Sequence, residues 1–247
     1  MGPDALLGLV PDAPPGVCAI LAASRGVVEP PIRSEIFGLQ RFAQHGRSLG
    51  VTHRAERAPL RAAGFFPRLR GNVQVLREAR SYIGEQAGTG YDISPAAEWL
   101  LDNFHLIEAQ VRAIHADLPH SYFRELPTLL DAPLAGLPRV YGIAWAFVAH
   151  TDGAFDEDLL VHFLLAYQET RELRLSEFWA LSTVLRVVLV ESLRRLAERV
   201  ATNKAARELA NRVCDRLTAY TPADLDPLLA LLHQRGVASA FLCQMAV

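Results

Sequence analysis

The stretch that decides the fold is Ser176-Glu-Phe-Trp-Ala-Leu-Ser-Thr-Val-Leu-Arg-Val-Val-Leu-Val-Glu-Ser-Leu-Arg-Arg-Leu-Ala-Glu-Arg-Val200. Its apolar residues recur every three or four positions, as on one face of an α-helix. Its most apolar window, Phe178 to Leu193, contains the charges of Arg186 and Glu191. A bilayer-spanning helix needs about 20 apolar residues with few charges. The stretch is therefore predicted to be a buried helix rather than a transmembrane segment.

The clearest helix on the N-terminal side of this stretch begins at Ser94-Pro95. Serine is a common N-cap, and proline suits the first helical turn. The apolar stripe that follows must end near Pro119, because proline lacks the backbone N–H that a helix needs. The connection from Leu118 to Pro138 contains four prolines. It is too long for a simple turn and is expected to be packed or functional.

Further helices are predicted over 139–150 and from Asp156 onward. Asn203 is expected to break the long central helix before another helix that runs to Leu217, and Thr221-Pro-Ala-Asp224 resembles the capping box of a last helix. No alternating β-branched run and no Asn-Gly hairpin signal occurs. The prediction is an all-α array of about eight or nine helices with no sheet.

Residues 1–31 contain six of the fifteen prolines and several glycines. This composition predicts an extended, poorly ordered lead-in, without the basic start of a secretory signal. From about Ile32 the pattern becomes helical, and residues 32–247 are predicted to form a single α-helical domain. The last residues, Phe241 to Val247, end in an apolar helical stretch without a polar tail. We therefore expect the domain to be truncated at its C-terminal end.

The net charge of −2 conceals a division along the chain. Residues 25–80 hold 11 Arg against 4 Glu, whereas residues 81–247 hold 14 Lys and Arg against 21 Asp and Glu. The basic segment could contact an anionic membrane surface. Its arginines are spread out like those of a solvated helix face, and its phenylalanines suit a core better than base stacking. Nucleic-acid binding is not expected.

No catalytic or metal-binding motif is recognisable. The acidic triplets at 156–158 and 224–226 resemble a cation-binding motif of sugar transferases, but each lies where a helix starts and is better explained as capping. The eight histidines form no metal-binding pair, and the three cysteines lie far apart. No cofactor is expected in this chain.

Four residues around the long connection are candidates for contact with a glucan or with a protein partner: Tyr122, Arg124, Arg139 and Tyr141. Ring faces and planar donors suit the binding of a pyranose. The same residues could instead anchor the connection to the helices, with Arg139 bonding exposed carbonyl groups. Anchoring is the preferred interpretation.

Several ordered motifs between about Pro30 and Val247 resemble the N-terminal region of cyclic β-1,2-glucan synthases. They are Pro31-Ile-Arg-Ser-Glu-Ile-Phe37, Phe66-Pro-Arg-Leu-Arg-Gly-Asn72, Glu98-Trp-Leu-Leu-Asp-Asn-Phe104, Tyr122-Phe-Arg-Glu-Leu-Pro127, Pro133-Leu-Ala-Gly-Leu-Pro-Arg-Val-Tyr141, Val148-Ala-His-Thr-Asp152 and Leu175-Ser-Glu-Phe-Trp-Ala-Leu181. The resemblance implies an enzyme that builds and cyclises β-1,2-linked glucose chains from UDP-glucose at the cytoplasmic face of a bacterial inner membrane. The transferase signatures of such enzymes, Thr-Glu-Asp and Gln-x-x-Arg-Trp, do not occur here, so no catalytic residue can be carried over.

The resemblance implies a non-catalytic helical N-terminal domain that scaffolds the glucosyltransferase and cyclisation modules of the same polypeptide. A free-standing helical interaction protein without enzymatic activity is the alternative. A weak β-1,2-glucan-binding module is a further one.

Overall fold

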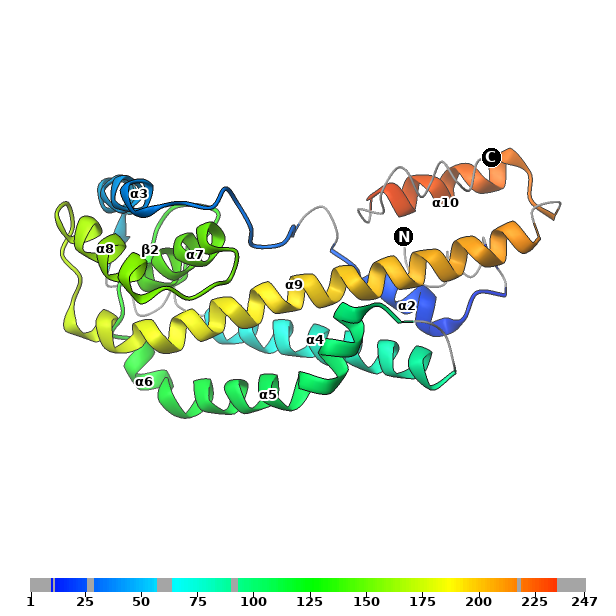
Figure 1. Ribbon diagram of the computed structural model, residues 1–247, viewed down its shortest axis with the longest axis horizontal. Coiled ribbons are helices and arrows are strands. Elements are labelled where there is room, and N and C mark those ends of the chain that lie inside the picture. Colours follow the sequence, from blue (N-terminus) through cyan, green and yellow to red (C-terminus); the bar gives the residue numbers. More distant parts are fainter. Residues whose placement is uncertain are drawn as a thin grey trace. The chain divides into compact units, whose positions relative to one another are not determined.

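A computed structural model describes residues 10, 12–25, 29–56, 64–89, 93–216 and 219–234. Helices dominate this part of the chain, which confirms the all-α prediction (Figure 1). The helices are α2 (Pro15–Ala23), α3 (Leu39–Thr52), α4 (Phe65–Gly88), α5 (Pro95–Asp117), α6 (His120–Phe123), α7 (Arg139–Thr151), α8 (Glu157–Gln168), α9 (Leu175–Asp215) and α10 (Pro222–Gln234).

A short antiparallel strand pair departs from the expectation of no sheet. Strand β1 (Ala55–Glu56) pairs with β2 (Thr128–Leu129), with Ala55 opposite Leu129. The backbone N–H of Leu130 also donates to the carbonyl of Arg54, 3.0 Å away. A strand of two residues is too short to be recognised from an alternation of apolar and polar residues in the sequence. The pair forms because the backbone of the buried connection needs hydrogen-bond partners.

The residues of the chain cluster into two compact units, and the single domain expected over 32–247 stays a prediction. Residues 1–31, 75–104 and 194–247 form what we call the terminal unit; residues 32–74 and 105–193 form the central unit. Helices α4, α5 and α9 contribute residues to both.

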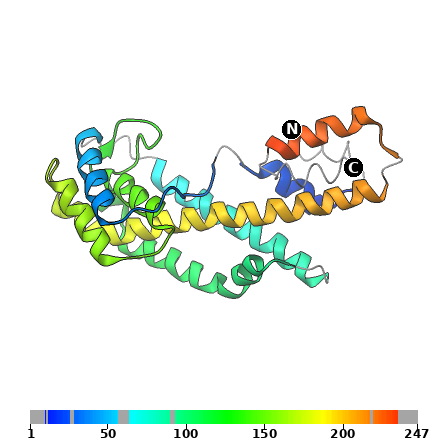
Figure 2. The same ribbon diagram turned by 45° about the horizontal axis from the view of Figure 1, so that its top comes forward.

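In the central unit, α3 and α8 lie side by side in close backbone contact (Figure 2). Two glycines one helical turn apart on α3 permit this contact. A Cβ atom added to Gly46 would lie 2.6 Å from the carbonyl oxygen of Phe163, and one added to Gly50 would lie 2.7 Å from that of Tyr167. Both distances are below van der Waals contact, so glycine is the residue that fits. The later glycine of α3 faces the later residue of α8, so the two helices run in the same direction.

Helix α7 is the most buried helix of the central unit, and Asp152, the residue that follows its last turn, has a left-handed φ of 54°. Its C-terminal carbonyls bind the chain that precedes α3: Ser34 N donates to Ala149 O at 2.8 Å and Phe37 N to His150 O at 3.1 Å. Residues 32–38 are consequently extended, and the helix that we expected from Ile32 starts only at Leu39.

Helix α9 continues through the position where we expected a break at Asn203. The apolar face persists beyond that point in small side chains that are fully or nearly fully buried, Ala201, Ala205 and Ala206, followed by Leu209. An asparagine in a helix interior costs less than about 1 kcal/mol relative to alanine. The burial of these neighbours outweighs that cost.

The lead-in is more ordered than predicted, because it contains α2. Pro15 occupies the first turn of α2, where its missing N–H is not needed, and Val17, Cys18 and Leu21 are buried in the terminal unit. The later part of the lead-in is held by polar contacts. Arg194, 1% exposed, pairs with Glu29, and Arg195 donates to the carbonyl of Pro30 at 2.6 Å. Residues 1–9, 11 and 26–28, like the expected C-terminal truncation at Phe241–Val247, lie outside the described residues.

Gly46→Ala should destabilise the protein. The added methyl group meets backbone atoms of α8 at 2.6 and 3.1 Å, and such overpacking costs about 1–3 kcal/mol. The gain in helix propensity is about 1 kcal/mol. Urea unfolding followed by far-UV circular dichroism measures the difference. Gly71→Ala in α4 is the matched control, since its Cβ meets nothing within 4 Å, and it should be neutral or stabilising. Equal effects of the two variants would contradict the close packing.

Candidate functional site

The four residues proposed from the sequence all lie in the central unit, but they do not form one binding surface. Arg139 and Tyr141 are buried in α7, Tyr122 is half-buried, and Arg124 is exposed. Tyr122 donates its hydroxyl hydrogen to the carbonyl of Ser176 in the first turn of α9. Three of the four side chains are thus used inside the protein.

Arg139 anchors the end of the long connection to the start of α9. Its guanidinium donates to the Glu177 carboxylate at 2.9 and 2.5 Å and to the carbonyl of Glu172 at 3.0 Å. Glu177, 0% exposed, also accepts from the backbone N–H of Arg174 at 3.0 Å, as the acid of a capping box does. Burial opposes the charge of Arg139, but the bond to Glu177 outweighs it and raises the pKa of Arg139. The carbonyl bond is the one expected of an anchoring arginine.

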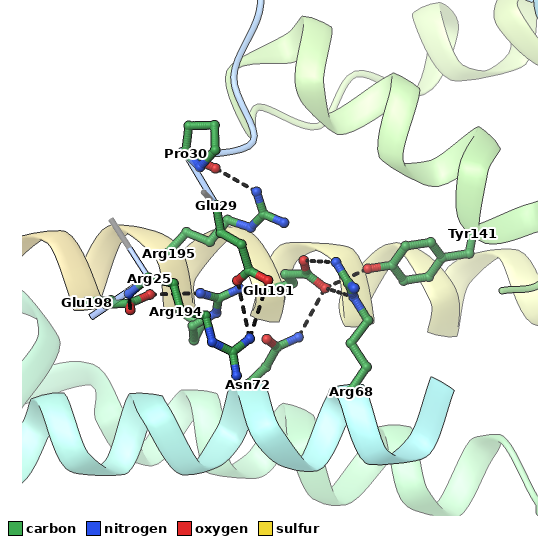
Figure 3. Close-up of polar contacts among 10 residues, drawn as sticks. All are labelled: Arg25, Glu29, Pro30, Arg68, Asn72, Tyr141, Glu191, Arg194, Arg195 and Glu198. Atoms are coloured by element: carbon green, nitrogen blue, oxygen red, sulfur yellow. Dashed lines mark hydrogen bonds and ion pairs between the residues drawn. The ribbon is translucent and has the colours of Figure 1, made fainter. Parts of the chain in front are cut away.

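Tyr141 belongs to a buried polar cluster around Glu191, which we call the Glu191 cluster (Figure 3). The carboxylate of Glu191, on α9, is 0% exposed. It accepts from the hydroxyl of Tyr141 at 2.7 Å, from two guanidinium nitrogens of Arg68 at 2.8 and 2.6 Å, and from the amide of Asn72 at 3.1 Å. Helices α4, α7 and α9 therefore meet at one ion.

The electrostatics of the Glu191 cluster keep its tyrosine and arginine donors protonated. Burial, together with the negative charge of Glu191, raises the pKa of Tyr141 far above its usual value, so this phenol stays protonated and remains a donor. The bond to Glu191 raises the pKa of Arg68. Every group of the cluster is committed to a neighbour, so the arrangement provides cohesion rather than a reactive acid or base.

The basic segment found in the sequence is compensated by the acidic one. Within the central unit, four arginines of 25–80 pair with acids of 81–247. The pairs are Arg33–Asp152 at 2.7 Å, Arg47–Glu169 at 2.5 Å, Arg54–Asp131 at 3.0 Å and Arg68–Glu191 at 2.6 Å. The first three lie at the surface, and in the last a partly exposed arginine reaches a buried carboxylate. Part of the division of charge along the chain is therefore matched internally.

The first acidic triplet serves as a helix cap, as expected. The carboxylate of Asp156 accepts from the backbone N–H of Leu159 at 3.0 Å, and the two acids that follow lie in the first turn of α8. The second triplet lies in the first turns of α10, where the side chain of Asp224 is outside the description. Among the described residues, no group of three or more His, Cys, Asp or Glu could hold a metal ion.

The terminal unit contains a cleft that the sequence did not indicate. Its volume is about 300 Å³, and residues of α4, the start of α5 and α9 line it. Four of the α9 residues are polar donors at helical spacing: Asn203, Lys204, Arg207 and Asn211. In the sequence, Asn203 is predicted to break the helix. Polar residues recur every four positions at Asn203, Arg207 and Asn211, next to the sole lysine of the chain, and this spacing was the available signal for a polar stripe on one helix face.

His53, directly after α3, is half-buried and faces Tyr167 of α8. Its Nδ1 lies 3.1 Å from the hydroxyl of Tyr167. Burial, reinforced by the positive charges of Arg139 and Arg171, lowers the pKa of His53 to about 4. Burial, moderated by Arg139, raises the pKa of Tyr167 to about 12. Both rings are therefore neutral near pH 7.

These features define an all-helical module whose buried charges serve internal cohesion. Within the described residues, no helix is sufficiently long and apolar to cross a membrane. No protein-family model matches the chain. The cyclic beta-(1,2)-glucan synthase NdvB of Rhizobium meliloti (strain 1021) is 36% identical over 220 residues, which make up 87% of this chain and 8% of that relative. The resemblance indicated by the motifs is confirmed: the chain is related in sequence to a small part of a cyclic β-1,2-glucan synthase.

Glu191→Gln should destabilise the central unit by about 1.5–3 kcal/mol, because the partly exposed Arg68 and the buried Tyr141 then lose a charged hydrogen-bond acceptor. Glu169→Gln is the matched control, since it removes the same charge from an exposed pair with Arg47. It should change stability little, because such pairs are solvated and screened. Denaturant unfolding compares the two. Similar losses would show that Glu191 does not have the special role assigned to it.

Stability should fall as the pH is lowered from about 6.5 to 4, because the unfolded chain then binds a proton at His53 that the folded chain does not bind. Above this window both states are neutral at His53, and below it both are charged. His53→Gln should reduce the slope by at most about 1.4 kcal/mol per pH unit. His162→Gln, at an exposed histidine, should leave the slope unchanged. Thermal unfolding across this pH range measures both, and identical slopes in all three proteins would refute the assignment.

Proposed function

We propose that this chain is a non-catalytic helical module of a cyclic β-1,2-glucan synthase, and that it scaffolds the modules that transfer glucose from UDP-glucose and cyclise the product. The observation that carries the proposal is the sequence relationship, which extends over 87% of this chain but only 8% of the synthase. A region so small relative to the whole is well suited to a supporting role.

The contacts of the buried charged residues support a non-catalytic role. Arg139, Glu177 and Glu191 are all held in saturated contacts. A general acid or base needs access to a reacting group. In the central unit these side chains lack such access.

By the same resemblance, we propose that the module works at the cytoplasmic face of a bacterial inner membrane, with the remaining modules of the synthase as its partners. The internal pairing of Arg33, Arg47 and Arg54 with acids makes a strongly basic membrane-binding face less favourable. Attachment through protein contacts is therefore the preferred arrangement over attachment through anionic lipid.

The purified chain should release no UDP from UDP-glucose, and the synthase should depend on the fold of the module. In the native gene, Glu191→Gln should lower the cyclic β-1,2-glucan made by isolated membranes severalfold, because the scaffold unfolds. Glu169→Gln should leave the yield unchanged. Radiolabelled UDP-glucose and chromatography of the neutral product measure the yield.

UDP release by the purified chain would show that it contains a catalytic site. Full glucan yield from membranes in which the Glu191→Gln module is unfolded would refute the scaffolding role. That second result would favour the alternative of a helical protein that acts apart from the synthase.

A further inference from the structure

The central unit contains a pocket of its own, formed by α3 and by the extended residues that precede it. Its volume is about 290 Å³, which is at the lower end of the range for small-molecule sites. The described residues that line it are Glu35, Phe37, Arg41, Gln44, His45 and Ser48. A pocket of this size admits a single small molecule.

Contacts with α7 and α3 hold the extended wall of this pocket in place. The backbone N–H of Phe37 donates to the carbonyl of His150 at 3.1 Å, and Nδ1 of His150 donates to the carbonyl of Glu35 at 2.7 Å. The imidazole of His150 also stacks on the ring of Phe37, with the two centroids 3.7 Å apart. The guanidinium of Arg41 lies over the same phenyl ring, 5.5 Å from its centroid. The pocket is therefore preformed, and a ligand does not have to order its wall.

The charges around the pocket cancel. The carboxylate of Glu35 forms an ion pair with the guanidinium of Arg41. Burial, together with the nearby His150, lowers the pKa of His45, so this imidazole is neutral near pH 7. The described lining residues include no other charged side chain. The pocket therefore offers no net charge to an anion or a cation, and an uncharged ligand suits it.

Three neighbouring side chains of α3 bring unused hydrogen-bonding capacity to the pocket. Within the described part of the chain, the side chains of Gln44, His45 and Ser48 form no hydrogen bond. A carboxamide, a neutral imidazole and a hydroxyl group each offer both a donor and an acceptor. The hydroxyl groups of a ligand also donate and accept, so a ligand with several adjacent hydroxyl groups matches all three. Phe37, which is half-buried, adds an apolar surface beside them.

We propose that this pocket binds a single uncharged sugar ring, whose hydroxyl groups pair with Gln44, His45 and Ser48. Phe37 supplies the apolar surface that the C–H groups of such a ring require. The pocket is separate from the four residues around the long connection, none of which is among its described lining residues. The inference goes beyond the scaffolding role and does not depend on it. No bond is made or broken in this pocket.

Nuclear magnetic resonance titration of the ¹⁵N-labelled full chain tests the proposal, with glucose, glucuronate and glycerol as separate probes. Glucose should shift the backbone amide signals of residues 41–48 and should bind more tightly than either of the other two. Glucuronate has a similar ring with an added carboxylate, for which the neutral pocket has no counter-charge. Glycerol has adjacent hydroxyl groups but no ring to fill the pocket.

Gln44→Ala should weaken the binding of glucose roughly three- to tenfold, the loss expected for one hydrogen bond. Ser48→Ala in the same chain should weaken it further. Gln40→Ala is the matched control, because Gln40 is an exposed glutamine of the same helix outside the lining of the pocket. It should leave the affinity unchanged. All three side chains are exposed and alanine favours a helix, so the variants stay folded, which circular dichroism confirms.

Absence of shifts in residues 41–48 at high millimolar glucose would overturn the proposal. So would equal weakening by Gln40→Ala and Gln44→Ala. Binding of glucuronate or glycerol as tightly as glucose would also overturn it, since the pocket would then select neither for neutrality nor for a ring. None of these outcomes bears on the glucan yield that tests scaffolding.

Discussion

The central unit depends on one carboxylate that has no access to water. Glu191 lies on the most apolar stretch of the chain, and an unpaired charge there would cost several kcal/mol. The fold meets this cost only if Arg68, Asn72 and Tyr141 all reach the same two oxygen atoms. Hydrophobic packing is tolerant of small slides between helices, but this set of hydrogen bonds is not. The carboxylate thereby selects one register for α4, α7 and α9.

The same logic of matched charges extends to the surface of the central unit. Arg47 reaches Glu169 next to the glycine contact between α3 and α8, and Arg54 reaches Asp131 beside the strand pair. Each of these pairs contributes little by itself. Together they distribute opposite charges over contacts between distant parts of the sequence. Opposite charges of distant segments therefore meet in the central unit, in addition to local pairs such as Arg41–Glu35.

The elements with strong local signals were predictable from the sequence. Ser94 caps α5 through a bond of 3.3 Å to the N–H of Ala97, and Asp156 caps α8, both as expected. The strand pair and the helix α2 were missed because tertiary contacts stabilise segments whose own signal is weak or is masked by proline. The continuity of α9 through Asn203 was missed for a related reason: a penalty for one residue is readily outweighed by burial of its neighbours.

The candidate site was less predictable than the fold. The sequence singles out the aromatic and basic residues around the connection, but Arg139 and Tyr141 face the core, which only the packing reveals. The cleft combines residues more than 100 positions apart, Ile83 with those of α9. None of its lining residues stands out in the sequence, and their combined chemistry becomes visible only when the fold brings them together. A single sequence carries no direct signal of that convergence.

The pairing of Arg68 with Glu191 also has a consequence in time. These residues are 123 positions apart, so during synthesis the guanidinium leaves the ribosome well before its counter-ion exists. At the usual rate of about 5–20 residues per second, the delay is roughly 6–25 seconds. The acids that pair with Arg33, Arg47 and Arg54 are all made before Glu191, so the buried carboxylate is the last of these counter-ions to appear. The contact that fixes α4, α7 and α9 can therefore form only when most of the chain has been synthesised, and the central unit completes its packing late.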